Sequence, residues 1–140
     1  MPEGRRDKKQ FADFVRIHAI NGNLITREDE MLVLKEGITR YRMELDEATG
    51  IMLSVAAEHD IALASQAEHQ IEAMLEQVVK RGKIGQKEFA DAVAVYAKLT
   101  HGSLGVPEIQ KRVKQMVQEH GWRGKRTRRI FGTRKWFRKI

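Results

Sequence analysis

The chain has 140 residues, with 26 Lys and Arg against 19 Asp and Glu, and it contains no Cys. This length favours one domain with a real core, and the lack of Cys excludes disulfides, thiolate zinc sites and thiol nucleophiles. The start lacks the apolar stretch of a secretory signal, and no run approaches the ~20 apolar residues that span a bilayer. We therefore expect a cytoplasmic protein without a transmembrane segment.

Helical periodicity dominates residues 11–120, which we expect to form one all-helical domain. Residues 1–10 are expected to be a flexible basic N-terminus. Six helices are predicted: from Phe11 to the stop at Asn21 and Gly22, from Thr26 to about Tyr41, from Asp46 to about Asp60, from Ser65 to Gly82, from Gln86 to the loop at His101, and from Pro107 to about His120.

Ser65 and Glu68 form a capping-box pattern at the start of the fourth helix. The short join between Asp60 and Ser65 leaves open whether the third and fourth helices are continuous.

The chain also repeats itself, because residues 11–60 and 71–121 match at an offset of about 60. Phe11 corresponds to Ile71, and Val15 corresponds to Leu75. Two copies predict a pseudo-symmetric pair of three-helix units packed on one core, since a solenoid needs three or more units. The expected core is Phe11, Phe14, Val15, Leu24, Leu32, Leu53, Val55, Leu75, Val78, Ile84, Phe89, Val93, Val113 and Val117.

Each copy carries the same loop pattern of Gly, any residue, an aliphatic residue, three residues and Glu, at Gly22–Glu28 and at Gly82–Glu88. The pattern resembles the second half of an EF-hand loop, and it is similar to the loops of TerB-like tellurite-resistance domains. The resemblance implies an all-helical, EF-hand-like or TerB-like pair of units.

Calcium binding is not expected, because an EF-hand also needs oxygen ligands early in its loop. The matching places hold Ile17, Ala19 and Asn21 in the first copy, and Gln77, Val79 and Arg81 in the second. We expect no metal and no cofactor.

The pair His59 and Asp60 is similar to the metal-binding pair of HD-domain phosphohydrolases, with His18 and Asp91 as formal further ligands. This alternative competes with a simpler reading, in which His59 stabilises the end of a helix through the helix dipole. The second copy has His120 at the equivalent place, followed by Gly instead of Asp. No phosphate loop, nucleophile elbow or catalytic triad is recognisable. We expect no catalytic residue and a protein that is not an enzyme.

The last twenty residues, 121–140, carry nine Lys and Arg and no acid, whereas the preceding 120 residues have a net charge of −2. Both Trp residues lie there as well. We predict a basic aromatic tail that engages an anionic surface and whose removal leaves the body folded. The residues expected to bind are Trp122, Arg123, Lys125, Arg126, Arg128, Arg129, Phe131, Arg134, Lys135, Trp136, Phe137, Arg138 and Lys139.

Nucleic acid, either RNA or DNA, is the first expected partner, because the tail has more Arg than Lys and guanidinium groups match phosphate bidentately. The aromatic side chains fit base stacking, and they fit insertion into an anionic membrane equally well. An acidic protein within a larger assembly is a third candidate. The expected function is therefore non-catalytic binding or scaffolding.

Overall fold

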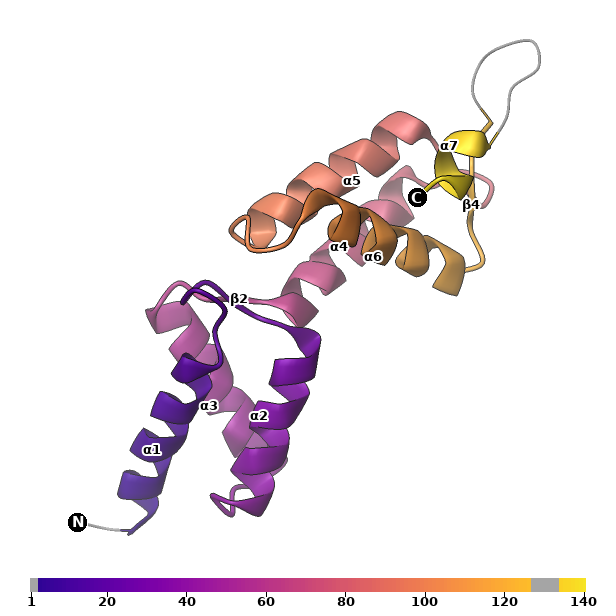
Figure 1. The fold of residues 1–140 in the computed structure, drawn as a ribbon. Coiled ribbons are helices and arrows are strands. Elements are labelled where there is room, and N and C mark those ends of the chain that lie inside the picture. The colour runs from indigo at the N-terminus through magenta and orange to yellow at the C-terminus, as the bar shows by residue number, and fades with distance from the viewer. Residues whose placement is uncertain (1–2, 127–133) are drawn as a thin grey trace. The chain divides into compact units, whose positions relative to one another are not determined.

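The computed structural model describes residues 3–126 and 134–140 (Figure 1). It is largely helical, which confirms the all-α prediction, and its short strands form two parallel pairs. Its internal contacts divide the chain into a first unit, Met1–Gln66, and a second unit, Ala67–Ile140. We describe each unit by itself.

The first unit begins with three helices and two short strands: α1 (Glu3–Ile17), β1 (Leu24–Ile25), α2 (Arg27–Thr39), α3 (Leu45–Glu58) and β2 (Ala62–Leu63). The strands pair in parallel, with Leu24 opposite Ala62 and Ile25 opposite Leu63. Buried side chains from all three helices, both strands and the loops before α3 and before β2 form one hydrophobic cluster: Phe11, Val15, Ile25, Val33, Met43, Ala48, Met52, Val55, Ala56, Ile61 and Leu63.

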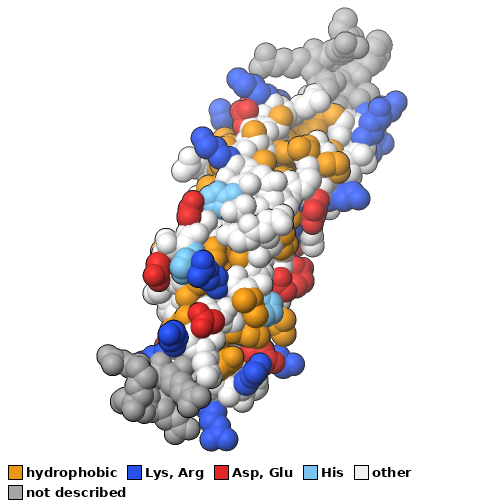
Figure 2. All heavy atoms as spheres, turned by 60° about the vertical axis from the view of Figure 1, so that its left-hand side comes forward, with side chains coloured by type: hydrophobic (Ala, Val, Ile, Leu, Met, Phe, Trp, Pro, Cys, Tyr) orange, Lys and Arg blue, Asp and Glu red, His pale blue; other side chains and the backbone are white. Residues whose placement is uncertain are grey.

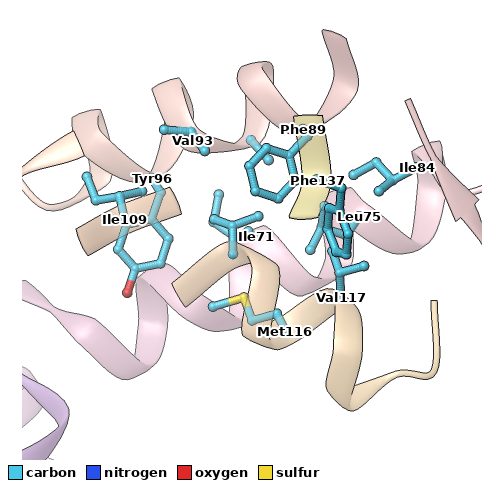
Figure 3. Packing of buried hydrophobic residues seen from close by; sticks show 12 residues of the cluster. Ile71, Leu75, Ile84, Phe89, Val93, Tyr96, Ile109, Met116, Val117 and Phe137 are labelled. Carbon is cyan, nitrogen blue, oxygen red and sulfur yellow. The ribbon is translucent and has the colours of Figure 1, made fainter. Parts of the chain in front are cut away.

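The second unit follows the same order of elements and adds a short final helix. Its elements are α4 (Ala64–Val78, which begins in the last residues of the first unit), β3 (Lys83–Ile84), α5 (Gln86–Leu99), α6 (Val106–Glu119), β4 (Arg123–Gly124) and α7 (Lys135–Arg138). β3 and β4 again pair in parallel. A second hydrophobic cluster is drawn in Figure 3: Ile71, Leu75, Ile84, Phe89, Ala92, Val93, Tyr96, Ile109, Val113, Met116, Val117 and Phe137.

The joint between the first helix and the first strand has the same backbone in both units. Asn21 and Gly22 have φ of +52° and +73°, and Arg81 and Gly82 have φ of +54° and +72°. Two successive residues in the left-handed region turn the chain sharply, and Gly adopts that region without steric cost. The Gly of each loop pattern therefore marks a turn, as its place in the sequence predicts.

The two clusters reach similar packing with different side chains at matching places. In the first unit, a Cβ placed on Gly37 would lie 2.9 Å from Phe11 Cζ, so the aromatic ring occupies the space beside this glycine. The loop before α5 is one residue shorter than the loop before α2, so the matching residues in the second unit are Ile71 and Tyr96, which are both buried. The large ring thus comes from α1 in one unit and from α5 in the other.

The structure answers one question that the sequence left open and changes two expectations about individual elements. The third and fourth helices are separate, because Asp60 has φ of +53° and β2 follows it. Ser65 makes no capping box with Glu68. Its backbone N–H and its hydroxyl both donate to the buried carboxylate of Glu30, the former at 2.8 Å. Residues 3–10, expected as a flexible N-terminus, lie in the first turns of α1.

Two predicted core residues are on the surface: Leu32 is 41% exposed and Leu53 is 39% exposed. Each is adjacent to a buried residue of its helix, Val33 and Met52, and neighbouring helical residues point about 100° apart. Of the remaining predicted core, Phe14 and Val78 are partly buried and the others are buried.

Leu24 and Ile84 are both fully buried, as predicted. In the structure the loop of the second unit is one residue shorter, so Ile84, the second residue of β3, matches Ile25 and not Leu24. However, the strand of each pairs within its own unit, β1 with β2 and β3 with β4, and not with the other loop. The chain segment after the third helix of each unit therefore anchors that unit's own loop.

Candidate anion-binding groove

The described part of the predicted tail belongs to the second unit. Phe137 is 8% exposed and meets Phe89 edge to face, with ring centroids 6.0 Å apart. In Figure 3, Phe137 lies among the side chains of the second cluster. A Cβ placed on Gly124 would lie only 2.7 Å from the Phe137 Cβ, so glycine at this strand position allows α7 to approach. Phe137 is therefore a core residue and not an exposed anchor.

Both Trp side chains also have contacts within the unit. Trp136 Nε1 donates a hydrogen bond of 2.9 Å to the carbonyl of Lys125, and its ring lies 5.6 Å from that of Phe89. Trp122 stacks on His120, with centroids 4.3 Å apart and planes at 11°. These rings are partly buried, so packing explains the aromatic residues that the sequence suggested for base stacking or lipid insertion.

The basic residues of this segment remain largely at the surface. Arg123, Lys125, Arg126, Lys135, Arg138 and Lys139 are exposed, and Arg134 is partly buried. Arg128, Arg129 and Phe131, which belong to the predicted binding set, lie outside the described residues. On the face of the second unit that Figure 2 presents, Lys and Arg side chains stand out and acidic side chains are fewer.

Two adjoining hollows, of 430 and 610 Å³, lie at the start of α5. They share Gly85, Glu88 and Lys125, so we treat them as one basic groove. Six cationic side chains and one carboxylate line it, together with four uncharged residues. The lining is Val78, Lys80, Arg81, Lys83, Gly85, Gln86, Lys87, Glu88, Lys125, Arg126 and Trp136.

Backbone hydrogen bonds hold together the two chain segments that carry Lys80, Lys83 and Lys125. Lys80 and Lys83 exchange two backbone hydrogen bonds of 3.0 Å across the turn at Arg81 and Gly82. The N–H of Arg123 donates to Gly82 O at 2.8 Å, and the N–H of Lys125 donates to Ile84 O at 2.6 Å. Residues forty positions apart in the chain are thereby fixed side by side.

The electrostatic consequence is a concave surface on which positive charge predominates. Cations around a hollow reinforce one another's field and raise the local concentration of anions. The first turn of α5 lies at the same place, and the positive end of its dipole adds to that field. The groove is therefore a site of net positive potential.

Four of the six cations, Lys80, Arg81, Lys83 and Lys87, were not among the predicted binding residues. A signal for them exists in the sequence, since residues 80–88 contain these four cations and only one acid. Part of that run, Gly82–Glu88, matches the loop pattern, which by itself does not predict anion binding. The pairing of β3 with β4 is what connects it to Lys125 and Arg126.

The second unit also holds a buried ion pair with a structural role. Arg112 Nε donates to Glu68 at 2.5 Å, and Glu68 is 4% exposed. The hydrogen bond from Arg112 to Glu68 raises the pKa of the guanidinium above its usual range, although burial opposes this. The Arg112–Glu68 pair ties α6 to α4, and within α6 Arg112 also reaches Glu119 at 3.5 Å.

The residues that the phosphohydrolase alternative requires lie on different elements and make different contacts. His59 caps the end of α3, and its backbone N–H donates to Val55 O. His18 Nδ1 donates to Phe14 O at 2.8 Å, and Asp91 belongs to α5 in the other unit. Within residues 3–126 and 134–140, no three His, Asp or Glu side chains cluster as metal ligands would.

The comparisons with known proteins assign no family to this chain. No protein-family model, curated protein or solved structure matches the chain. In the part of the chain that the structure describes, no helix combines the length and the apolar character needed to cross a membrane.

Proposed function

We propose that this chain is a non-catalytic binding protein whose basic groove holds the phosphate backbone of a nucleic acid. The observation that carries the proposal is the groove lining, in which six cations from two distant segments surround a single carboxylate. Phosphate contacts supply most of the affinity of sequence-independent nucleic-acid binding.

The packing of the aromatic residues favours nucleic acid over a membrane surface. Interfacial insertion needs apolar side chains that are free to leave the protein. Phe137 is buried, and Trp136 is half-buried with its indole N–H bonded to Lys125 O. The same packing reduces base stacking, so we expect duplex and single strands to bind through their backbones.

The fold that we propose for this binding protein is a tandem pair, EF-hand-like or TerB-like, in which only the second unit carries the groove. The repeated order of helices and strands supports it. We place the protein in the cytoplasm.

The test is binding of the full chain to a labelled DNA duplex, the matching single strand and anionic vesicles at 50 and 200 mM salt. With five or six phosphate contacts, the log–log salt slope on duplex should be roughly −5. The variant Lys80→Gln/Arg81→Gln/Lys83→Gln should reduce the slope by about 3 on duplex and by about 2 on the single strand.

The control variant is Lys98→Gln/Lys111→Gln, which removes two exposed cations of the same unit that do not line the groove. It should change the slope little. The groove variant removes three charges and the control removes two. Losses in proportion to the charge removed would show that net charge, and not the groove, drives binding. Binding to vesicles alone would contradict the choice of nucleic acid.

A second candidate is a protein-assembly adaptor, and the surface of the first unit favours it. Of the nine exposed large hydrophobic residues in the described chain, seven lie in this unit, including Met31, Leu32 and Ile38 on α2. Exposed apolar side chains grouped on one element indicate protein contacts. Met31→Lys/Ile38→Lys should then abolish capture of a protein partner and leave nucleic-acid binding intact.

A further inference from the structure

Glu88 is the one acidic side chain among the eleven residues of the basic groove, and it lines both hollows. It belongs to the first turn of α5, where Gly85 is the N-cap residue. Because glycine has no side chain, it cannot cap this helix in the way that Thr26 caps α2 by accepting from Asp29 N at 3.2 Å.

The Glu88 carboxylate folds back over that uncapped end. A Cβ placed on Gly85 would overlap Glu88 Oε2, and the Glu88 Cδ would lie 3.2 Å from it. The φ of Gly85 is −75°, which any residue adopts, so backbone strain does not demand glycine here. The space that glycine leaves is filled by the carboxylate.

A carboxylate at this place has the same charge as the ligand proposed for the groove. It is stabilised by the cations and by the positive end of α5, which are the features that attract a phosphate. A phosphate that enters the groove therefore meets an anion already in place. It must displace that carboxylate or bind beside it against Coulomb repulsion.

We infer that Glu88 is an internal competitor for the phosphate of the ligand and that it lowers the affinity of the groove for nucleic acid. This inference rests on the proposed function. The affinity is then set by a balance inside the groove, between six cations and one carboxylate that neutralises part of their field.

The experiment measures the Kd of the full chain for a labelled DNA duplex at 150 mM salt, with Glu88→Gln and with Glu108→Gln as the matched control. Glu108 is likewise an acid in the first turn of a helix, α6, but it is exposed and does not line the groove. Both substitutions raise the net charge by one. Glutamine keeps the size of the side chain and a carbonyl oxygen that can fold back over the helix end.

We expect Glu88→Gln to bind about three- to tenfold more tightly than the unchanged protein, a factor typical of one close charge pair near a surface. Glu108→Gln should bind less than twofold more tightly. Glu88→Ala, with its melting temperature measured beside the others, gives a second reading if Gln changes the loop. Its affinity should also rise.

The outcomes separate the two proposals. If no variant, nor the unchanged chain, binds nucleic acid, the proposed function fails. If the chain binds with the expected salt slope, but Glu88→Gln and Glu88→Ala gain no more affinity than Glu108→Gln, the role of Glu88 is overturned and the groove assignment stands.

Discussion

The two units place the same elements in the same order, yet they differ in charge. The first unit holds 9 Lys and Arg against 12 Asp and Glu, a net of −3, and the second holds 17 against 7, a net of +10. At the places of Lys80, Arg81 and Lys87, the first unit has Ile20, Asn21 and Glu28. The shared fold depends on buried residues and turn glycines. Binding depends on exposed residues, whose charge can change while the buried residues stay the same.

The units also differ in how the chain continues after the second strand. After β2, the chain enters α4, whose first turn is held by the Glu30 carboxylate through Ser65. After β4, α7 returns and packs Phe137 against Phe89, the residue that matches Glu30. The Glu30–Ser65 hydrogen bonds of the first unit and the Phe89–Phe137 contact of the second unit thus occur at equivalent positions. This comparison suggests four tests.

The largest effect should come from removing the aromatic contact of the second unit. Phe137→Ala should destabilise the second unit by about 3–5 kcal/mol, because it opens a cavity in the core beside Phe89. Hydrogen exchange should show faster opening of the amides of α5 and α6 than in the unchanged chain, while those of α1 and α3 keep their protection.

The control is Val95→Ala, at a side chain of α5 that is 39% exposed, which should change stability by less than about 0.5 kcal/mol.

The same packing revises one expectation from the sequence. Removal of residues 121–140 deletes β4 and Phe137, so it should unfold the second unit and not leave the body intact. A 1–120 fragment with unchanged protection in α5 and α6 would refute this.

The next effect concerns the large ring of each core, which comes from α1 in the first unit and from α5 in the second. Gly37→Ala should cost about 1–3 kcal/mol, because its Cβ would press on the Phe11 ring. Phe11→Leu shrinks that ring, so Gly37→Ala should cost less in its background. A double-mutant cycle by urea unfolding measures the difference. Additive losses would show that the two residues do not compete for the same space.

A smaller effect is expected when the cations of the second unit are copied into the first. Ile20→Lys/Asn21→Arg/Glu28→Lys should tighten duplex binding by about threefold, because surface charge contacts are worth little singly. Glu44→Lys/Glu58→Lys, with the same change in net charge, is the control. The grafted site stays weak because Ala64 and Ser65 stand where the second unit has Lys125 and Arg126. If the grafted variant and its control bind duplex equally tightly, net charge alone explains the gain in affinity.

Calcium should have the smallest effect. Millimolar calcium should leave the melting temperature unchanged, since calcium needs six to eight oxygen ligands and the described residues bring no three acidic or His side chains together. A rise of several degrees that disappears with Glu28→Gln or with Glu88→Gln would show that one of the loops binds the ion.

Much of the frame could be predicted from local pattern. Helical spacing identified Phe11 and Val15 with Ile71 and Leu75, and all four are fully buried. Gly22 and Gly82 marked the turns, because only a few residue types adopt a positive φ easily. Spacing failed for Leu32 and Leu53, since apolar residues occur on more than one face of α2 and α3 and periodicity cannot choose between faces.

The candidate site was predicted only in part. The cluster of nine cations at the C-terminus pointed to an anionic partner, and Lys125 and Arg126 do line the groove. Lys80, Arg81 and Lys83 were missed because their association with that segment requires the pairing of β3 with β4. Two-residue strands leave almost no signal in a sequence.

By itself, the sequence determined that the chain is helical, that its turns lie at the repeated glycines and that its positive charge gathers toward the C-terminus. These properties depend on residues that are close in the chain, where spacing and backbone preference act directly. Only the tertiary structure decided that Trp136 and Phe137 pack inward and that two basic segments form one groove around Glu88. Those outcomes depend on contacts between distant residues, and the energy of such contacts is not contained in any local pattern.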